Sequence, residues 1–154
     1  MQEWYFEDIP MKQPMTTSEY LVPAEEMIAF AQKWDPSPLH IDPEAAKSSP
    51  LGGVIASSVY TLAISTALGH GLGTRMVMVG GAEWQIRLLV PVRPGDRFVE
   101  TVECIEKRQC RTKPDRGIVR FLSIVQNQNG QRVLELEATS VVSRRPIHQG
   151  TDTL

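Results

Sequence analysis

The chain of 154 residues contains little of the residue types that mark several large classes of protein. Its two cysteines, Cys104 and Cys110, are too few for a disulfide framework, and its three histidines allow no zinc-ligand spacing. It also lacks an excess of positive charge, because 16 Lys and Arg residues oppose 18 Asp and Glu residues. The net charge of −2 argues against nucleic acid or an anionic membrane as a partner, and the sparse cysteines favour a reducing cytoplasm.

Long hydrophobic runs and a signal peptide are also missing. Residues 1–10 carry acidic side chains and no basic residue ahead of an apolar stretch, so they lack the pattern of a secretory signal. Residues 51–74 contain no Asp, Glu, Lys or Arg, but glycine, serine and threonine dilute their apolar residues below the density that membrane insertion needs. We therefore expect a helix inside a soluble protein.

Helices are predicted in the first half of the chain. Apolar side chains three and four residues apart indicate an amphipathic helix over residues 23–34. Residues 35–38, Asp-Pro-Ser-Pro, predict a rigid loop, since each proline removes a backbone donor and restrains the residue before it. Asp42 and Pro43 then predict an N-cap and the first turn of a short helix that ends near residues 48–49.

A central helix is predicted from Val54 or Ser57 to about Leu68, and it is apolar on nearly every side. Such a helix has no face suited to water, so we expect the rest of the fold to surround it. His70, between two glycines, is expected near its end.

The second half of the chain changes to the period of strands. Residues 84–90 alternate apolar with polar side chains, and further strands are predicted over residues 98–105, 118–126 and 134–138, with turns at 94–96 and 129–130. Because the turns are short, we expect consecutive strands to be antiparallel neighbours, in an α+β fold whose sheet wraps the central helix. We predict one domain over residues 1–154, with a core of about 20–145 and a polar C-terminal tail at 146–154.

Asp35 and His40 are the strongest candidates for chemistry. An acid–base pair needs two titratable groups of different type in a fixed relation, and the prolines around these residues restrict their backbone. The spacing by itself is equally compatible with structural roles, with Asp35 in a turn and His40 as an ordinary surface or core histidine.

The residues around this pair belong to a longer pattern. It runs through Trp34-Asp35-Pro36-Ser37-Pro38-Leu39-His40-Ile41-Asp42-Pro43-Glu44-Ala45-Ala46 and Gly52-Gly53-Val54-Ile55-Ala56-Ser57-Ser58, and continues in Pro91-Val92-Arg93-Pro94-Gly95-Asp96, Arg116-Gly117-Ile118-Val119 and Asn127-Gln128-Asn129-Gly130. As a set, these segments resemble the MaoC-like dehydratases and (R)-specific enoyl-CoA hydratases, between about Trp34 and Val142. The resemblance implies the hotdog fold, an antiparallel sheet wrapped around a long apolar helix.

The resemblance also implies an activity. In this family water adds reversibly and syn to a trans-2-enoyl thioester, giving the (R)-3-hydroxyacyl thioester, and Asp35 and His40 match the essential pair. The implied site has no metal and no bound cofactor, because coenzyme A or phosphopantetheine belongs to the substrate. The expected partner is therefore an acyl-CoA or an acyl carrier protein.

Four further residues are candidates for binding the substrate. Ser57 and Ser58, at the start of the central helix, offer N–H groups to the charge that develops on the thioester oxygen. They stand where many family members have His-Gly, and Ser37 stands where many have Asn. Thr66 lies two helical turns beyond Ser58, where some hydratases place a hydroxyl, although a hydroxyl bonded to its own helix is the plainer interpretation.

A run of cations between residues 107 and 116 is the last candidate. It contains Lys107, Arg108, Arg111, Lys113 and Arg116. These residues either contact the phosphates of coenzyme A or the acidic face of a carrier protein, or belong to a solvated hairpin. Trp34 and Trp84 leave a similar choice between the lining of an acyl tunnel and ordinary core.

The sequence as a whole predicts an acyl-thioester hydratase or dehydratase with a single hotdog domain. A lone hotdog leaves one sheet edge and one sheet face to be covered, so we expect a homodimer or a higher homo-oligomer. Two alternatives stay open. One is a hotdog thioesterase, and the other is a catalytically silent acyl-binding or assembly subunit, which the departures at Ser37 and Ser58 keep in consideration.

Overall fold

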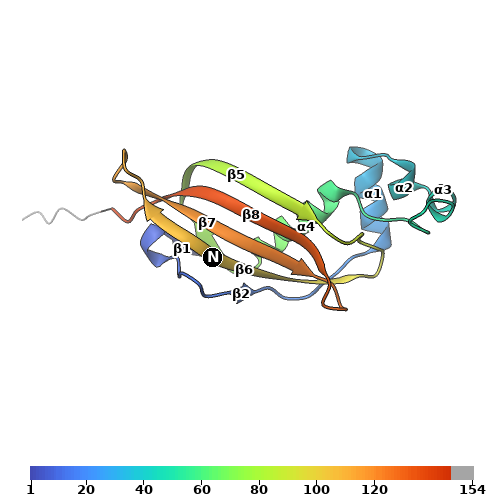
Figure 1. The fold of residues 1–154 in the computed structure, drawn as a ribbon, viewed down its shortest axis with the longest axis horizontal. Helices are drawn as coiled ribbons and strands as arrows, with labels where there is room; N and C mark the ends of the chain where they lie inside the picture. Colours follow the sequence, from blue (N-terminus) through green and yellow to red (C-terminus); the bar gives the residue numbers. More distant parts are fainter. Residues whose placement is uncertain (147–154) are drawn as a thin grey trace, which may run out of the picture.

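The computed structural model describes residues 1–146, and its main elements are a large antiparallel sheet and the helix that crosses it (Figure 1). The long strands are β5 (Met78–Leu88), β6 (Arg97–Gln109), β7 (Arg116–Gln126) and β8 (Arg132–Ser143). Short strands β2 (Met15–Thr16) and β3 (Tyr20–Leu21) pair with β6, while β1 (Gln2–Trp4) pairs in parallel with β4 (Thr74–Met76). The predicted α+β class is confirmed.

The strand order corrects one expectation. β6, β7 and β8 are antiparallel neighbours as predicted, but β5 pairs with β8 and not with β6, the strand that follows it. Apolar side chains favour this register, since Ile86 is opposite Leu136 and Leu88 is opposite Leu134. The connection over residues 89–96 contains two prolines, so it crosses the end of the sheet and does not fold back as a hairpin.

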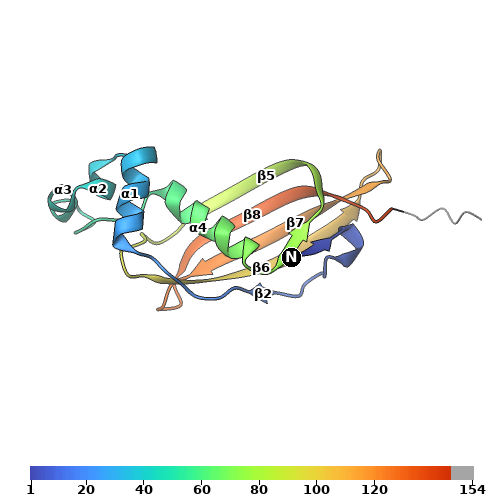
Figure 2. The ribbon, with the colours of Figure 1, turned by 180° about the vertical axis from the view of Figure 1, so that it is seen from behind.

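The central helix α4 (Ser58–His70) lies against one face of this sheet (Figure 2). Its Tyr60, Ile64 and Leu68 are buried in the main core together with apolar residues of β6, β7 and β8. The expectation that the helix is surrounded on every side is wrong for a single chain, because Val59 is 54% exposed and Ala63 is exposed on the same face. One curved sheet covers only one side of a helix, so an apolar strip of α4 remains open to solvent.

The edge strand β5 is exposed in a similar way. Its predicted alternation is present, yet Trp84 is 49% exposed and Ile86 and Leu88 are exposed too. β5 pairs with β8 along one side, and no described strand pairs with its other side. An apolar strand with a free edge and an apolar helical strip therefore lie uncovered in the same chain.

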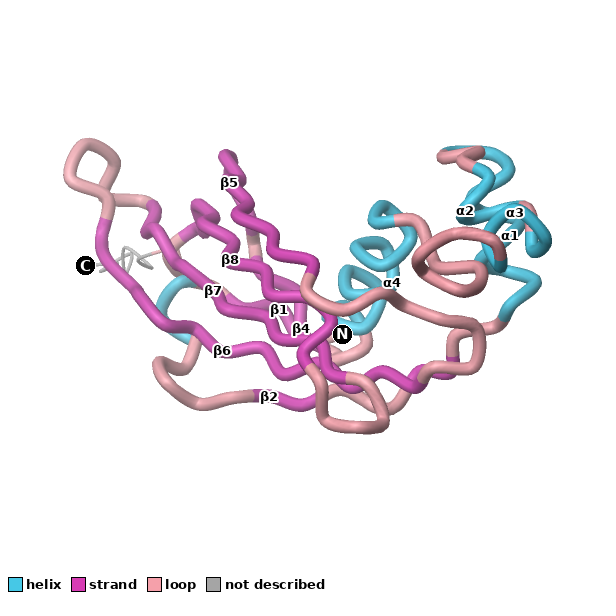
Figure 3. Tube along the Cα trace, turned by 45° about the vertical axis from the view of Figure 1, so that its right-hand side comes forward, coloured by secondary structure: helices cyan, strands magenta, loops and turns pink. Residues whose placement is uncertain are grey.

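Three short helices gather near the first turn of α4 (Figure 3). They are α1 (Ala24–Trp34), α2 (Pro38–Ile41) and α3 (Pro43–Lys47). The predicted rigid loop shortens to residues 35–37, because Pro38 takes the first position of α2, where the helix needs no backbone N–H donor. Asp42 caps α3 as predicted and accepts hydrogen bonds from the Glu44 and Ala45 amides at 3.0 and 3.1 Å. Trp34 is exposed and does not belong to the core.

The N-terminal segment had no predicted structure, because its strands are only two or three residues long. The core nevertheless begins at Phe6 and Ile9 and not near residue 20. The Phe6 ring lies against Gly117 of β7, where any added Cβ would approach the ring to 2.1 Å.

No helix within residues 1–146 has the length and apolarity to cross a bilayer. The predicted C-terminal tail lies outside the described residues, apart from Pro146.

Candidate active site

Asp35 and His40 lie together beside the first turn of α4. Asp35 is the C-cap of α1 and His40 belongs to α2, so the turn between these helices brings the two side chains toward each other. His40 Nε2 is 3.4 Å from Asp35 Oδ2. The His40 side chain is 14% exposed and the Asp35 side chain 38%, which leaves the pair reachable mainly from the side of the carboxylate.

The backbone between the two residues holds this arrangement. The Asp35 amide donates to the carbonyl of Ala31 at 2.9 Å and ends α1, and the Ser37 amide donates to the Asp35 carbonyl at 2.8 Å. The His40 amide then donates to the Ser37 carbonyl at 2.9 Å. Ser37 therefore orients His40 through its backbone, and its hydroxyl makes no capping hydrogen bond to α2.

Ser57 orients the carboxylate from the other side. It is fully buried as the N-cap of α4, and its hydroxyl donates to Asp35 Oδ2 at 2.7 Å while accepting from the Val59 amide at 3.2 Å. Ser57 was singled out in the sequence for its position at a helix start. Its side chain, which joins residues 22 positions apart, is the group that the fold brings to the site.

The carbonyl of Ile55 determines the tautomer of His40. His40 Nδ1 is 2.8 Å from this oxygen, and a carbonyl can only accept, so Nδ1 carries a hydrogen. In a neutral imidazole the lone pair is then on Nε2, the nitrogen that faces Asp35. Two acceptors cannot hydrogen-bond each other, whereas a water molecule can donate one hydrogen to each. With a neutral His40, the pair can therefore accept two hydrogen bonds from a small O–H donor such as water.

Ser58 and Thr66 have different surroundings from Ser57. Ser58 is the exposed first residue of α4, where backbone N–H groups have no acceptor within the helix. The Thr66 hydroxyl donates to the Leu62 carbonyl of its own helix at 3.0 Å. The structure thus places Ser58 beside the Asp35–His40 pair through its neighbour Ser57, and it places Thr66 farther along α4.

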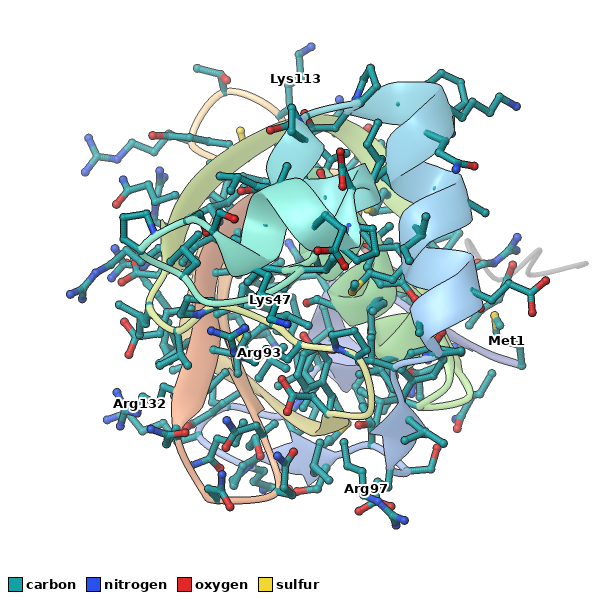
Figure 4. The ribbon with its side chains drawn as sticks, turned by 90° about the vertical axis from the view of Figure 1, so that its right-hand side faces the viewer. Met1, Lys47, Arg93, Arg97, Lys113 and Arg132 are labelled. Carbon is teal, nitrogen blue, oxygen red and sulfur yellow. The ribbon has the colours of Figure 1, made fainter. Side chains whose placement is uncertain are left out.

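The basic hairpin lies at the opposite end of the chain from Asp35 and His40 (Figure 1). Arg111 and Lys113 are exposed in the β6–β7 connection, and Arg116 pairs with Asp115 at 2.7 Å. Within one chain the structure does not bring these three cations to the pair. Arg93 belongs to the family-like pattern but was not a candidate site residue. Its guanidinium donates to the Leu51 carbonyl at 2.5 Å in the loop before α4. Figure 4 views this end and shows Arg93 and Lys47 there.

A second carboxyl, which was also not singled out, is buried under α4. Glu100 of β6 is 1% exposed, and its Oε1 accepts a hydrogen bond from the Ser65 hydroxyl at 2.8 Å. Burial raises the pKa of the Glu100 carboxyl, and the Ser65 and Ser123 hydroxyls oppose this only in part. No sequence signal distinguishes Glu100 from the other glutamates of the strands.

Among residues 1–146, no three His, Cys, Asp or Glu side chains are placed to hold a metal ion.

Comparisons with known proteins place this chain in a family. The model of the MaoC like domain matches residues 6–127. A MaoC-like dehydratase from Rhodospirillum rubrum is 31% identical, with a TM-score of 0.80 over 94% of this chain and 99% of that chain. A structure described as a monoamine oxidase regulatory protein from Archaeoglobus fulgius is 26% identical, with a TM-score of 0.82 over 95% of this chain and 98% of that chain.

A curated relative has no described function. The uncharacterized protein YdeM of Bacillus subtilis (strain 168) is 29% identical over 140 residues, which are 90% of this chain and 98% of that protein. The family match covers most of the chain, and solved members share its sheet and helix. The chain is therefore a member of the MaoC-like dehydratase family and has the hotdog fold.

Proposed function

We propose that the protein is a hydro-lyase that adds water reversibly to a trans-2-enoyl thioester. The observation that carries the proposal is the convergence of Asp35 Oδ2 and His40 Nε2 at 3.4 Å, with Ser57 orienting the first and the Ile55 carbonyl orienting the second. Membership of a dehydratase family supports the same reaction class.

In this mechanism a water molecule donates its two hydrogens to Asp35 and His40. One of these groups removes a proton while the water oxygen bonds to the β-carbon, and the π electrons move toward the thioester carbonyl. The α-carbon then takes up a proton and the carbonyl re-forms. Because His40 Nδ1–H is held by the Ile55 carbonyl, neutral His40 has no proton to give from Nε2. The proton delivered to the α-carbon is therefore the one taken from water.

The start of α4 is proposed to stabilise the charge on the thioester oxygen. Ser58 begins the helix next to Ser57, and the first-turn N–H groups and the helix dipole both favour a negative charge there. Donors aimed at a developing oxyanion contribute strongly to catalysis because they need no reorganisation during the reaction.

Coenzyme A or a phosphopantetheine carrier is the proposed carrier of the acyl chain, with no cofactor beyond it. Arg93 and Lys47 lie at the end of the molecule that holds Asp35 and His40, so they are the cations of the same chain that its phosphates would meet (Figure 4). The hairpin cations Arg111, Lys113 and Arg116 lie at the other end of the molecule. They remain candidates only for contacts with a substrate that extends that far or with a carrier protein.

A homodimer is proposed as the working form, in the cytoplasm. The apolar strip of α4 and the free edge of β5 lie uncovered in one chain, and a second copy covers both without any further partner. Replacing Trp84 with lysine is expected to give monomers in sedimentation velocity, because a buried charge would oppose the contact. Unchanged dimers would argue against β5 as the interface.

The test of the reaction uses trans-2-enoyl-CoA thioesters of increasing chain length. Loss of the enoyl absorbance and formation of the (R)-3-hydroxyacyl product are expected with the wild type, and a loss of about a hundredfold or more is expected in Asp35→Asn and His40→Ala. Release of free thiol would indicate a thioesterase instead.

A silent acyl-binding subunit is the second candidate. Two observations favour it, namely Ser58, where many members of the family carry glycine, and the likeness to a protein described as regulatory. Binding of a saturated acyl-CoA by calorimetry, without turnover of any enoyl thioester, would select it.

A further inference from the structure

A cavity of about 570 Å³ lies between the second half of α4 and the sheet. Most of its wall is apolar, with Trp4, Met15, Phe121 and Leu136 among the lining side chains. Such a lining suits the methylene body of an acyl chain, since apolar surfaces removed from water stabilise the bound state.

The polar groups of the cavity are concentrated around one carboxyl. Glu100, Ser65, Ser123 and Ser140 all line it, and each is at least nine-tenths buried. Glu100 Oε1 is occupied by the Ser65 hydroxyl, whereas Oε2 is buried and, although the Ser123 hydroxyl is nearby, makes no hydrogen bond of normal geometry within residues 1–146. An unpartnered buried oxygen is costly for the fold, so a ligand that supplies a partner would be bound preferentially.

The charge state of this carboxyl narrows the choice of ligand. Burial raises the pKa of Glu100, and no cation pairs with it among the described salt bridges. His70 and Arg75 are the other titratable side chains that line the cavity, and both are exposed. The protonated form, which burial favours, offers one O–H donor and one acceptor, which complement a hydroxyl or a keto oxygen.

Serines of the same helix contact both Glu100 and Asp35 of the proposed catalytic pair. Ser57, Thr61 and Ser65 form a buried stripe on α4, spaced four residues apart. Ser57 binds Asp35 and Ser65 binds Glu100, and these two serines are eight residues apart along the helix, about 12 Å at 1.5 Å per residue. An extended chain advances about 1.2 Å per bond, so roughly ten bonds separate the β-carbon from Glu100.

We propose that Glu100 is a specificity-determining residue, which selects acyl thioesters that carry a neutral hydroxyl or keto group near the far end of the chain. The proposal rests on the hydratase function proposed above, because that function places the thioester beside Asp35 and His40. An unsubstituted alkyl chain leaves Glu100 Oε2 unpartnered. A chain that ends in a carboxylate has to bring its charge into the same apolar surroundings, which disfavour a charged group there.

The test compares saturated acyl-CoA thioesters of about twelve carbons, a length that follows from the separation above. One ends in a methyl group, one in a hydroxyl and one in a carboxylate. By titration calorimetry, the wild type is expected to bind the hydroxylated chain roughly tenfold more tightly than the alkyl chain, the size of one buried hydrogen bond. In Glu100→Leu this preference is expected to disappear or reverse, while the alkyl chain binds at least as well as before.

The controls separate this proposal from that of the hydratase. Glu103→Gln changes a carboxyl on the opposite face of the same strand and is expected to keep the preference. Glu100→Gln keeps the size of the side chain and its ability to hydrogen-bond. It takes the place of Glu100→Leu in the binding comparison if Glu100→Leu does not fold. Equal binding of the alkyl and hydroxylated chains by the wild type, or a preference that survives Glu100→Leu, would overturn the proposal. Enoyl-CoA turnover is measured in parallel. Turnover without the hydroxyl preference would contradict only the role of Glu100, whereas the preference without turnover would contradict only the hydratase function.

Discussion

Asp35 and Glu100 are two carboxyls held in the same manner in different surroundings. Each accepts a hydrogen bond from a serine of α4, at 2.7 Å from Ser57 and at 2.8 Å from Ser65. Asp35 is partly exposed and lies beside His40, so its carboxylate is in reach of solvent. Glu100 is buried and faces apolar side chains, which favour its protonated form. In the roles proposed above, the same serine–carboxyl contact supports proton transfer at one end of α4 and substrate recognition farther along the helix.

The largest expected effect comes from removing the charge at the exposed carboxyl. Asp35→Asn keeps the shape of the side chain and can still accept from Ser57, but it cannot take a proton from water. We expect kcat to fall by about 10²–10⁴, the usual range for a lost general acid or base. Circular dichroism and the Tm serve as controls for folding. An active Asp35→Asn variant would show that Asp35 does not take part in the proton-transfer step.

A smaller effect is expected from the serines themselves. Ser57→Ala removes the hydroxyl that orients Asp35 and caps α4, so we expect roughly a tenfold loss of kcat and about 1 kcal/mol of stability. Ser65→Ala removes the matching contact to Glu100 and is expected to leave kcat for a short-chain enoyl-CoA nearly unchanged. Steady-state kinetics on short chains distinguishes the two. Equal losses in both variants would mean that the carboxyls are coupled.

The smallest expected effect is on stability as a function of pH. The pKa of Glu100 is raised in the folded protein, so its contribution to stability is fully present below the unfolded pKa of about 4.3 and is lost as pH rises through the folded value. Glu100→Gln cannot ionise and is expected to avoid this loss. We expect its Tm to exceed that of the wild type by a few degrees at pH 8, and the difference to shrink toward pH 4.

A matched substitution makes that measurement specific. Glu103→Gln is on the other face of β6 and is expected to show a Tm difference that does not vary with pH in this way. A wild-type Tm that stays level between pH 4 and pH 8, relative to Glu100→Gln, would show that Glu100 is ionised at no cost in the fold.

Local parts of the structure were predictable because they depend on neighbouring residues. Asp42 and Pro43 begin α3 as predicted, and α1 and α4 lie where the apolar spacing indicates, because a helix is held by contacts three and four residues apart. The pairing of β5 was predicted wrongly, because a short connection favours the next strand only when nothing else pairs better. β8 offers β5 a long apolar register that no local rule contains.

The sequence by itself determined helices α1, α3 and α4, the long strands β5–β8, the Asp42 cap and the presence of Asp35 and His40 in a proline-restricted segment. Only the tertiary structure decided what these groups touch. Ser57 reaches Asp35 across 22 residues, the Ile55 carbonyl selects the His40 tautomer across 15, and Ser65 meets Glu100 across 35. Burial and hydrogen-bond partners depend on how distant elements pack, and no local pattern in the chain encodes them.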